Sequence, residues 1–262
     1  MAAWVWYLQT EGIRLDMTFK DLFSAQSADY ARFRPSYPAA LFSWLATAAP
    51  GRARAIDVAT GNGQAALALA DHFAEVVGVD ASAAQLAEAP GRANVTYRVG
   101  QAEATGAPDA SADLLTAAQA FHWFRQDAFF TEAARVLRPR GVLAVWSYNL
   151  TRITPAVDAL VQHVYADILG SYWEPERRLV EEGYAAVRFP FEPIPSPPFE
   201  MALDWDLPSL LGYVRTWSAL RAYVRARGVD PLVTLEPELA RAWGGAGTRT
   251  ARWTLSVHAS RR

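Results

Sequence analysis

AIDVATGNGQ, at Ala55–Gln64, joins an apolar run to an acidic residue and then to a glycine turn. A second apolar run that ends in an acid, VVGVDAS, follows at Val76–Ser82. Strand, glycine turn, helix, strand and acid in this order are typical of a nucleotide-binding βαβ unit. The two stretches therefore predict a Rossmann-like α/β fold that binds a nucleotide-containing cofactor.

The composition fits a globular enzyme rather than a nucleic-acid or metal protein. The 262 residues are 52% hydrophobic and carry a net charge of −2, so no basic surface is expected for nucleic acid. The absence of cysteine excludes disulfides and thiolate metal sites, and the four histidines are scattered, so we expect no metal. No apolar run has the length of a membrane span. We expect a cytoplasmic protein without membrane contacts, a monomer or a homodimer.

Strand and helix signals alternate over residues 54–149, which predicts a parallel sheet with right-handed crossovers and helices on both faces. After residue 150 the pattern changes to helices, among them one predicted over Leu207–Arg227, and to a proline-rich spacer at Pro190–Pro198. We expect a single domain with the following parts: a tail at 1–16, expected to be disordered, with Met17 as the native start; the domain at 17–262; its cofactor-binding core at 38–149; an acceptor-site lid at 151–247; and a final strand at 248–260.

The glycine turn fits two classes of cofactor. Gly61 and Gly63 begin a G-x-G-x-x-A pattern, and Asp80 follows at a distance suited to ribose hydroxyls, as in NAD(P)-dependent oxidoreductases. Asp57 favours another cofactor, because an acid at the end of the first strand can receive an amino group, which a dinucleotide pyrophosphate does not present. The polar Gln101–Glu103 segment after the third strand could meet an adenine edge.

These motifs, in order between Asp57 and Asn149, resemble class I S-adenosylmethionine (SAM)-dependent methyltransferases of the methyltransferase type 11-like group. The flanking DLFS…YARFRPSYP, AAQAFHWF and YVRTWSA resemble a subgroup that includes trans-aconitate methyltransferase-like small-molecule methyltransferases. The resemblance implies a seven-stranded, mostly parallel sheet with an antiparallel last strand and a helical lid. An NAD(P)-dependent oxidoreductase and a SAM-binding protein without activity are the alternatives.

The resemblance also implies which residues bind SAM. Asp57 would orient the methionyl ammonium group, and Asp80 would accept hydrogen bonds from both ribose hydroxyls. Gly61 and Gly63 would let the backbone approach the cofactor without a Cβ clash. Ala59 replaces a glycine that is common in the family, and we expect this small residue to preserve binding. The alternative for the two acids is a capping or turn role, and the ordered motifs favour SAM binding.

Five further positions complete the predicted cofactor site. Ala102 and Glu103 would lie beside adenine, although Glu103 could equally be a solvated loop acid. Gln119 would contact the methionine part of SAM. Tyr30 and Arg34 could close over the SAM carboxylate or bind an acidic acceptor, and the alternative is that they anchor an N-terminal helix.

Methyl transfer from a sulfonium requires mainly proximity, alignment and exclusion of water, and a general base only for a protonated acceptor. His122 and Trp123 are expected beside the methyl group, with His122 as the candidate base or, equally, a locally packed helix-start residue. The predicted acceptor is the carboxylate or hydroxyl of a small acid or secondary metabolite. Further residues expected around the acceptor are Trp146, Tyr148, Asn149, Trp173, Trp205, Tyr213, Arg215 and Trp217.

Overall fold

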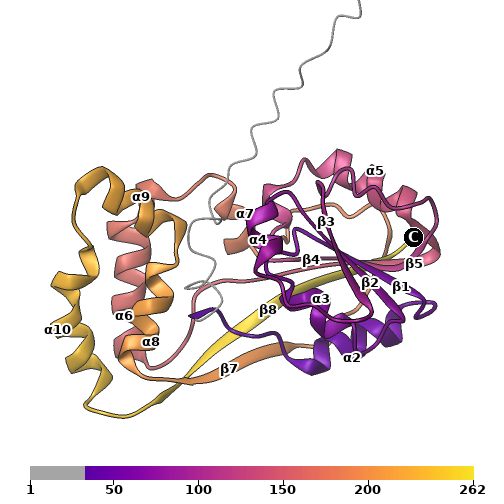
Figure 1. The fold of residues 1–262 in the computed structure, drawn as a ribbon. Coiled ribbons are helices and arrows are strands. Elements are labelled where there is room, and N and C mark those ends of the chain that lie inside the picture. Colours follow the sequence, from indigo (N-terminus) through magenta and orange to yellow (C-terminus); the bar gives the residue numbers. More distant parts are fainter. Residues whose placement is uncertain (1–32) are drawn as a thin grey trace, which may run out of the picture.

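An eight-stranded mixed sheet organises the fold in the computed structural model, which describes residues 33–262 (Figure 1). Its strands are β1 (Arg54–Val58), β2 (Glu75–Asp80), β3 (Val95–Val99), β4 (Ala112–Ala118), β5 (Leu137–Tyr148), β6 (Glu192–Ile194), β7 (Phe199–Trp205) and β8 (Arg249–Arg261). The order is β3-β2-β1-β4-β5-β8-β6, and β7 also pairs with β8. The first five strands pair in parallel, and β8 is antiparallel to β5, β6 and β7.

The Rossmann-like fold with an antiparallel final strand is therefore confirmed, and the number of strands is eight rather than seven. The additional strand, β6, lies within the proline-rich segment predicted to be only a spacer. Its residues Glu192 and Ile194 pair with Arg261 and Ala259 at the end of β8. Proline is tolerated there because β6 is an edge strand, where a missing N–H breaks no inner ladder.

Helices cover both faces of the sheet. Its central strands, β1, β2 and β4, are therefore buried almost throughout. The helices of this part are α2 (Ala39–Ala48), α3 (Gln64–Leu69), α4 (Ala83–Ala87) and α5 (Gln126–Val136). Apolar residues of α2 and α3 pack into one core with Leu114 and Trp146, and those of α5 pack into another with Ile56 and Leu115. These layers fix the ends of β1, β2 and β4, where the predicted cofactor residues lie.

A second group of helices stands beside the α/β part, joined to it by the long β7–β8 ribbon (Figure 1). The helical elements after β5 are α6 (Pro155–His163), the π-helical turn η3 (Val164–Ile168), η4 (Gly170–Tyr172), α7 (Arg177–Glu181), α8 (Leu207–Arg215), α9 (Ser218–Arg227) and α10 (Pro231–Trp243). Of these, α7 lies next to the α/β part, where its Val180 packs into the core of Ile56 and Leu115 (Figure 1). The prediction of one helix over Leu207–Arg227 is wrong. The chain leaves the helix at Trp217, which has an extended backbone (φ −69°, ψ 134°) and a buried side chain.

Several predictions fall on residues that the structure does not describe. The tail at 1–16, the start at Met17 and the site residue Tyr30 lie outside the described range. Within residues 33–262, no helix combines the length and the apolar character needed to cross a membrane.

Candidate active site

The glycine turn after β1 depends on left-handed backbone at Gly61 (φ 57°) and Gly63 (φ 81°). A Cβ at Gly63 would lie 2.3 Å from the Tyr97 hydroxyl oxygen, so the tyrosine of β3 requires a glycine there independently of any ligand. Ala59 also adopts a positive φ, of 50°. This explains why a glycine is common at that position, since an alanine is strained in this conformation.

Asp80 holds the glycine turn at the end of β2. Its Oδ2 accepts a hydrogen bond from the Gly61 N–H (2.8 Å), and its Oδ1 accepts one from the Ser82 N–H (2.8 Å). Each carboxylate oxygen has a second lone pair. A carboxylate that accepts only such hydrogen bonds is of the type that suits a pair of ligand hydroxyls, and here it also fixes the turn.

Asp57 lies completely buried below the same turn. Its carboxylate accepts hydrogen bonds from the hydroxyls of Thr60 (2.5 Å) and Thr116 (2.6 Å). Burial raises the pKa of Asp57 to about 6, although both hydroxyl bonds act in the opposite direction. The carboxylate would reach a ligand ammonium group across Thr60, and a positive charge there would offset the desolvation of the ionised acid.

Ala102 and Glu103 follow β3, as predicted. Ala102 is buried, and the Glu103 carboxylate accepts a hydrogen bond from the Arg125 N–H at the start of α5 (2.8 Å). The same carboxylate forms an ion pair with the Arg125 Nε (3.7 Å), which adds to the contact between Glu103 and the start of α5. Glu103 thus has a structural partner, in addition to any ligand.

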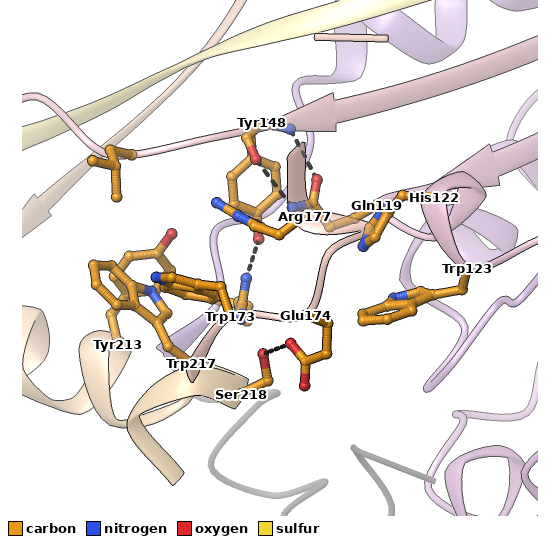
Figure 2. Close-up of a pocket in the computed structure, with 12 residues that line it drawn as sticks. Gln119, His122, Trp123, Tyr148, Trp173, Glu174, Arg177, Tyr213, Trp217 and Ser218 are labelled. Carbon is orange, nitrogen blue, oxygen red and sulfur yellow. Dashed lines mark hydrogen bonds between the residues drawn. The ribbon is translucent and has the colours of Figure 1, made fainter. Parts of the chain in front are cut away.

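Two adjoining cavities open at the carboxyl ends of the strands. The first, here the glycine-loop cavity, is lined by Arg34, Tyr37, Ala59, Gly61, Gln64 and Tyr148, among others. The second, the aromatic cavity, is lined by residues that include Gln119, His122, Trp123, Trp173, Arg177 and Trp217 (Figure 2). Arg34 and Tyr148 belong to both cavities. The Arg34 Nη1 donates to the Tyr148 hydroxyl (3.1 Å), which places this pair at the boundary.

Gln119 anchors that boundary to the sheet. Its amide Nε2 donates to the Tyr148 carbonyl (3.0 Å), and its Oε1 accepts from the Tyr148 N–H (2.8 Å). The residue has a positive φ of 54°, which is rare for a side chain of this size. The paired bonds fix the ends of β4 and β5 relative to each other and hold Gln119 in the wall of the aromatic cavity.

His122 lies in the short helix η2 (Phe121–Trp123) and is buried. Its Nδ1 hydrogen-bonds to the Tyr184 hydroxyl (3.0 Å). Burial and the nearby positive charge of Arg177 lower the pKa of His122 to about 3. The imidazole is therefore neutral near pH 7.

Known proteins resemble this chain over most of its length. A methyltransferase domain family matches residues 56–145. A Dictyostelium discoideum protein named as a methyltransferase is 35% identical over 238 residues, covering 89% of this chain and 90% of the relative. A solved structure from Anaeromyxobacter dehalogenans, described as a type II methyltransferase, matches with a TM-score of 0.82 and 45% identity over 87% of this chain and 98% of the other.

The chain belongs to the class I SAM-dependent methyltransferases. The family resemblance, the enzyme class and SAM as the cofactor are thereby confirmed, and the predicted oxidoreductase alternative is wrong. A Bacillus halodurans methyltransferase structure, with 22% identity and a TM-score of 0.50, shares the fold alone.

The glycine-loop cavity of this methyltransferase fits the polar groups of SAM. Arg34 lines it and offers a positive charge for a carboxylate, and Asp80, a hydrogen-bond acceptor suited to ribose hydroxyls, holds its turn through the Gly61 N–H. The positive φ angles at Gly61 and Gly63 form the turn, and Gly61 lines the cavity without a side chain. Bound SAM supplies an activated methyl group on a sulfonium.

The structure places some of the residues predicted around the acceptor at the aromatic cavity and the others elsewhere. Tyr148, Trp173, Tyr213 and Trp217 line the aromatic cavity, and Asn149 accepts a hydrogen bond from Arg177 there. The remaining residues lie elsewhere, for reasons of packing or charge: Trp146 is fully buried in the core, Trp205 packs on Trp253 (4.8 Å between ring centres), and Arg215 is exposed and pairs with Asp230 (2.9 Å).

Sequence reasoning missed three polar residues of the aromatic cavity of the methyltransferase, namely Glu174, Arg177 and Ser218. The Ser218 hydroxyl donates to the Glu174 carboxylate (3.1 Å), so the segment before α7 meets the start of α9 at the cavity (Figure 2). The signal available was the dense mixture of tryptophan and charge in WEPERR at Trp173–Arg178. That pattern is equally typical of a solvated helix start, which is why it did not stand out.

Proposed function

We propose that this methyltransferase transfers the SAM methyl group to a carboxylate or hydroxyl oxygen of a small acid or secondary metabolite. The observation that supports the proposal is the contact between the two cavities at Arg34 and Tyr148. A cofactor in one cavity and an acceptor in the other would meet at this pair. The elaboration at 151–247 would then serve as the lid of the acceptor site.

In this proposal the chain contributes orientation and exclusion of water rather than acid–base chemistry. The rings of Trp123, Trp173 and Trp217 enclose the aromatic cavity. Their faces attract a sulfonium cation and exclude water, and both effects favour an in-line displacement. Trp123 and His122 would form the wall beside the methyl group.

The cofactor contacts are also proposals. Arg34 would bind the methionine carboxylate, Asp57 the ammonium group by way of Thr60 or water, and Asp80 the ribose. Their support is that Arg34 and Thr60 line the glycine-loop cavity and that Asp80 and Asp57 hold its turn. Ala102 and Glu103 beside adenine and Gln119 beside the methionine part complete the set, and Tyr30 stays a prediction.

The test is methyl transfer from isotopically labelled SAM to a library of small mono-, di- and hydroxy acids, with product detection by mass spectrometry. Labelled esters or ethers of at least one acid are expected. If the protein binds S-adenosylhomocysteine (SAH) but methylates no member of the library, the result contradicts the proposal and favours a SAM-binding protein without activity.

Asp80 provides the matching test of the cofactor site. Asp80→Ala should weaken SAH binding at least tenfold, because charged hydrogen bonds contribute about 1.5–3 kcal/mol each. Ser82→Ala is the control, since it removes the α4 cap that Ser82 provides to the Gln85 N–H (3.3 Å) and keeps the backbone N–H that donates to Asp80. Calorimetry that gives the same SAH affinity for Asp80→Ala and the wild type would remove Asp80 from the site.

A further inference from the structure

Arg177 presents a positive charge to the aromatic cavity in a fixed orientation. Its Nε donates to the Tyr165 hydroxyl (3.0 Å), and its Nη2 donates to the Asn149 Oδ1 (2.6 Å). The guanidinium also lies over the ring of Trp173, 5.0 Å from the ring centre. Since the group is already held, little conformational entropy would be lost when it binds a ligand.

Within the part of the chain that the structure describes, some donors of the Arg177 guanidinium have no protein acceptor. The bonds to Asn149 and Tyr165 occupy Nε and one N–H of Nη2, so both N–H groups of Nη1 and the second of Nη2 are available. Among residues 33–262, Arg177 forms no ion pair with a carboxylate. Adjacent N–H groups on a planar cation match the two oxygens of a carboxylate.

We propose that Arg177 binds an oxyanion of the acceptor through Nη1 and Nη2, and that this oxyanion is a recognition group separate from the oxygen that is methylated. This inference rests on the proposed function and narrows its substrate class. Two hydrogen bonds from a cation withdraw electron density from the bound oxygens and make them poorer nucleophiles. The acceptor is therefore a small acid with a second oxygen nucleophile, such as a hydroxy acid or a dicarboxylic acid.

The other charged residues of the cavity support this assignment to Arg177. Arg34 is engaged with the Tyr148 hydroxyl, lies over the Tyr213 ring and belongs to both cavities, so it suits the cofactor carboxylate. Glu174 carries a negative charge in the same cavity and would repel an oxyanion from its own wall. Arg177 lines the aromatic cavity and not the glycine-loop cavity, so its charge faces the acceptor and not the cofactor.

Tyr165 is a positioning residue for Arg177. It lies in the π-helical turn η3, and its hydroxyl connects the Arg177 Nε to the carboxylate of Glu181, to which it also hydrogen-bonds. A π-helical turn is an irregularity that is frequent at functional sites. Here it places the tyrosine hydroxyl so that the negative charge of Glu181 supports the arginine without occupying its free donors.

The test measures binding directly, with SAH-loaded protein titrated with benzoate and with its neutral counterpart benzamide. Wild type should prefer benzoate, and Arg177→Gln should lose at least tenfold in benzoate affinity while SAH affinity changes less than twofold. The control is Arg178→Gln, the next residue in the same helix, whose 80% exposed side chain pairs with Glu182; it should behave as wild type. Tyr165→Phe should give an intermediate loss with unchanged SAH affinity.

Equal benzoate affinity in Arg177→Gln and wild type would overturn the inference, as would the absence of benzoate binding to wild type at about 10 mM, a concentration that detects weak complexes. For an acid that the library assay identifies, Arg177→Gln should raise KM at least tenfold with kcat within threefold, and the matched acid whose one carboxylate is its sole oxygen nucleophile should not be methylated. Benzoate binding through Arg177 without any turnover would contradict the proposed function instead.

Discussion

Ala59 carries conformational strain at the end of β1, with a φ of 50°. Left-handed backbone costs a residue with a Cβ about 1–2 kcal/mol, and glycine loses about 0.5–1 kcal/mol more backbone entropy on folding. Ala59→Gly should therefore raise the free energy of unfolding by up to about 1.5 kcal/mol. Since Ala59 lines the glycine-loop cavity, SAH affinity should be equal or higher. Thermal unfolding and calorimetry measure the two effects.

Ala110 is the matched control for this prediction. It has a similar φ of 46° but lies exposed in the loop before β4. Ala110→Gly should reproduce the change in stability and leave SAH affinity unaltered. Weaker SAH binding in Ala59→Gly alone would show that the Cβ of Ala59 contributes a contact to the cofactor.

His122 should not behave as a general base. Its pKa of about 3 lies far below that of any acceptor hydroxyl, and an efficient base has a pKa near the working pH. The pH profile of kcat should have no limb near pH 6.5, the ordinary histidine value. His122→Gln should lower kcat by less than tenfold and keep the shape of the profile. A loss of about a hundredfold or more, the usual contribution of a base, would contradict this prediction.

Among the contacts between elements, those of Asp113 connect three strands at their amino ends, away from the glycine turn. Its Oδ2 accepts from the N–H groups of Ala53 (2.8 Å) and Arg54 (3.0 Å) at the start of β1. Its Oδ1 accepts from the Arg138 Nη1 in β5 (2.7 Å), and the carboxylate is fully buried. The amino ends of β1, β4 and β5 thus share one side chain.

Asp113→Ala should destabilise the protein by about 3–5 kcal/mol, because it leaves a charge and two backbone donors without their partner. SAH affinity of the folded variant should stay within twofold of wild type, since the strands are altered at the end away from the cofactor. Asp71→Ala is the control: its ion pair with Arg92 is exposed, and such pairs contribute about 0–1 kcal/mol. Urea unfolding and calorimetry provide both quantities, and a loss below 1 kcal/mol for Asp113→Ala would contradict the assigned role.

The sequence predicted elements well where local signals define them. Apolar runs marked β1 and β2, and Ser82 marked the start of α4 through its side-chain cap. The break between α8 and α9 has no proline or glycine. It depends on Trp217, whose ring packs between Trp173 and Tyr213 at centre distances of 5.7 and 5.9 Å. Contacts between distant segments decide that break, so local patterns could not predict it.

At the scale of the whole molecule, one part of the candidate site depends on local sequence and the other on contacts between distant segments. The proposed cofactor site follows from short motifs, because the glycine turn and Asp80 are joined by one βαβ unit. The aromatic cavity, which we propose as the acceptor site, brings Arg177 of α7 and Ser218 of α9 to the ends of β4 and β5. The β7–β8 ribbon and the helices beside it create that proximity (Figure 1). These residues come from distant parts of the chain, so no sequence motif with a fixed spacing identifies them as a set.

Global stability should depend on pH through Asp57. The pKa of this buried acid is about 6 in the folded protein, against 3.8 as the ordinary value for the unfolded chain. Between these values the folded state binds a proton that the unfolded state does not. The contribution of Asp57 to the free energy of unfolding therefore rises as the pH falls from above 6 towards 4, by about 3 kcal/mol in full.

Asp57→Asn removes this titration and keeps the shape of the side chain. Without ligand, the variant should be more stable than wild type above pH 7, and this advantage should disappear as the pH falls to 4. Urea unfolding of both proteins at four pH values between 4 and 7.5 measures the difference, in which the titration of all other carboxylates cancels. The same variant should bind SAH more weakly at pH 7.5, because a neutral amide cannot pair with the ammonium group. A stability difference that is constant with pH would contradict the raised pKa, and an unchanged SAH affinity would contradict the cofactor role.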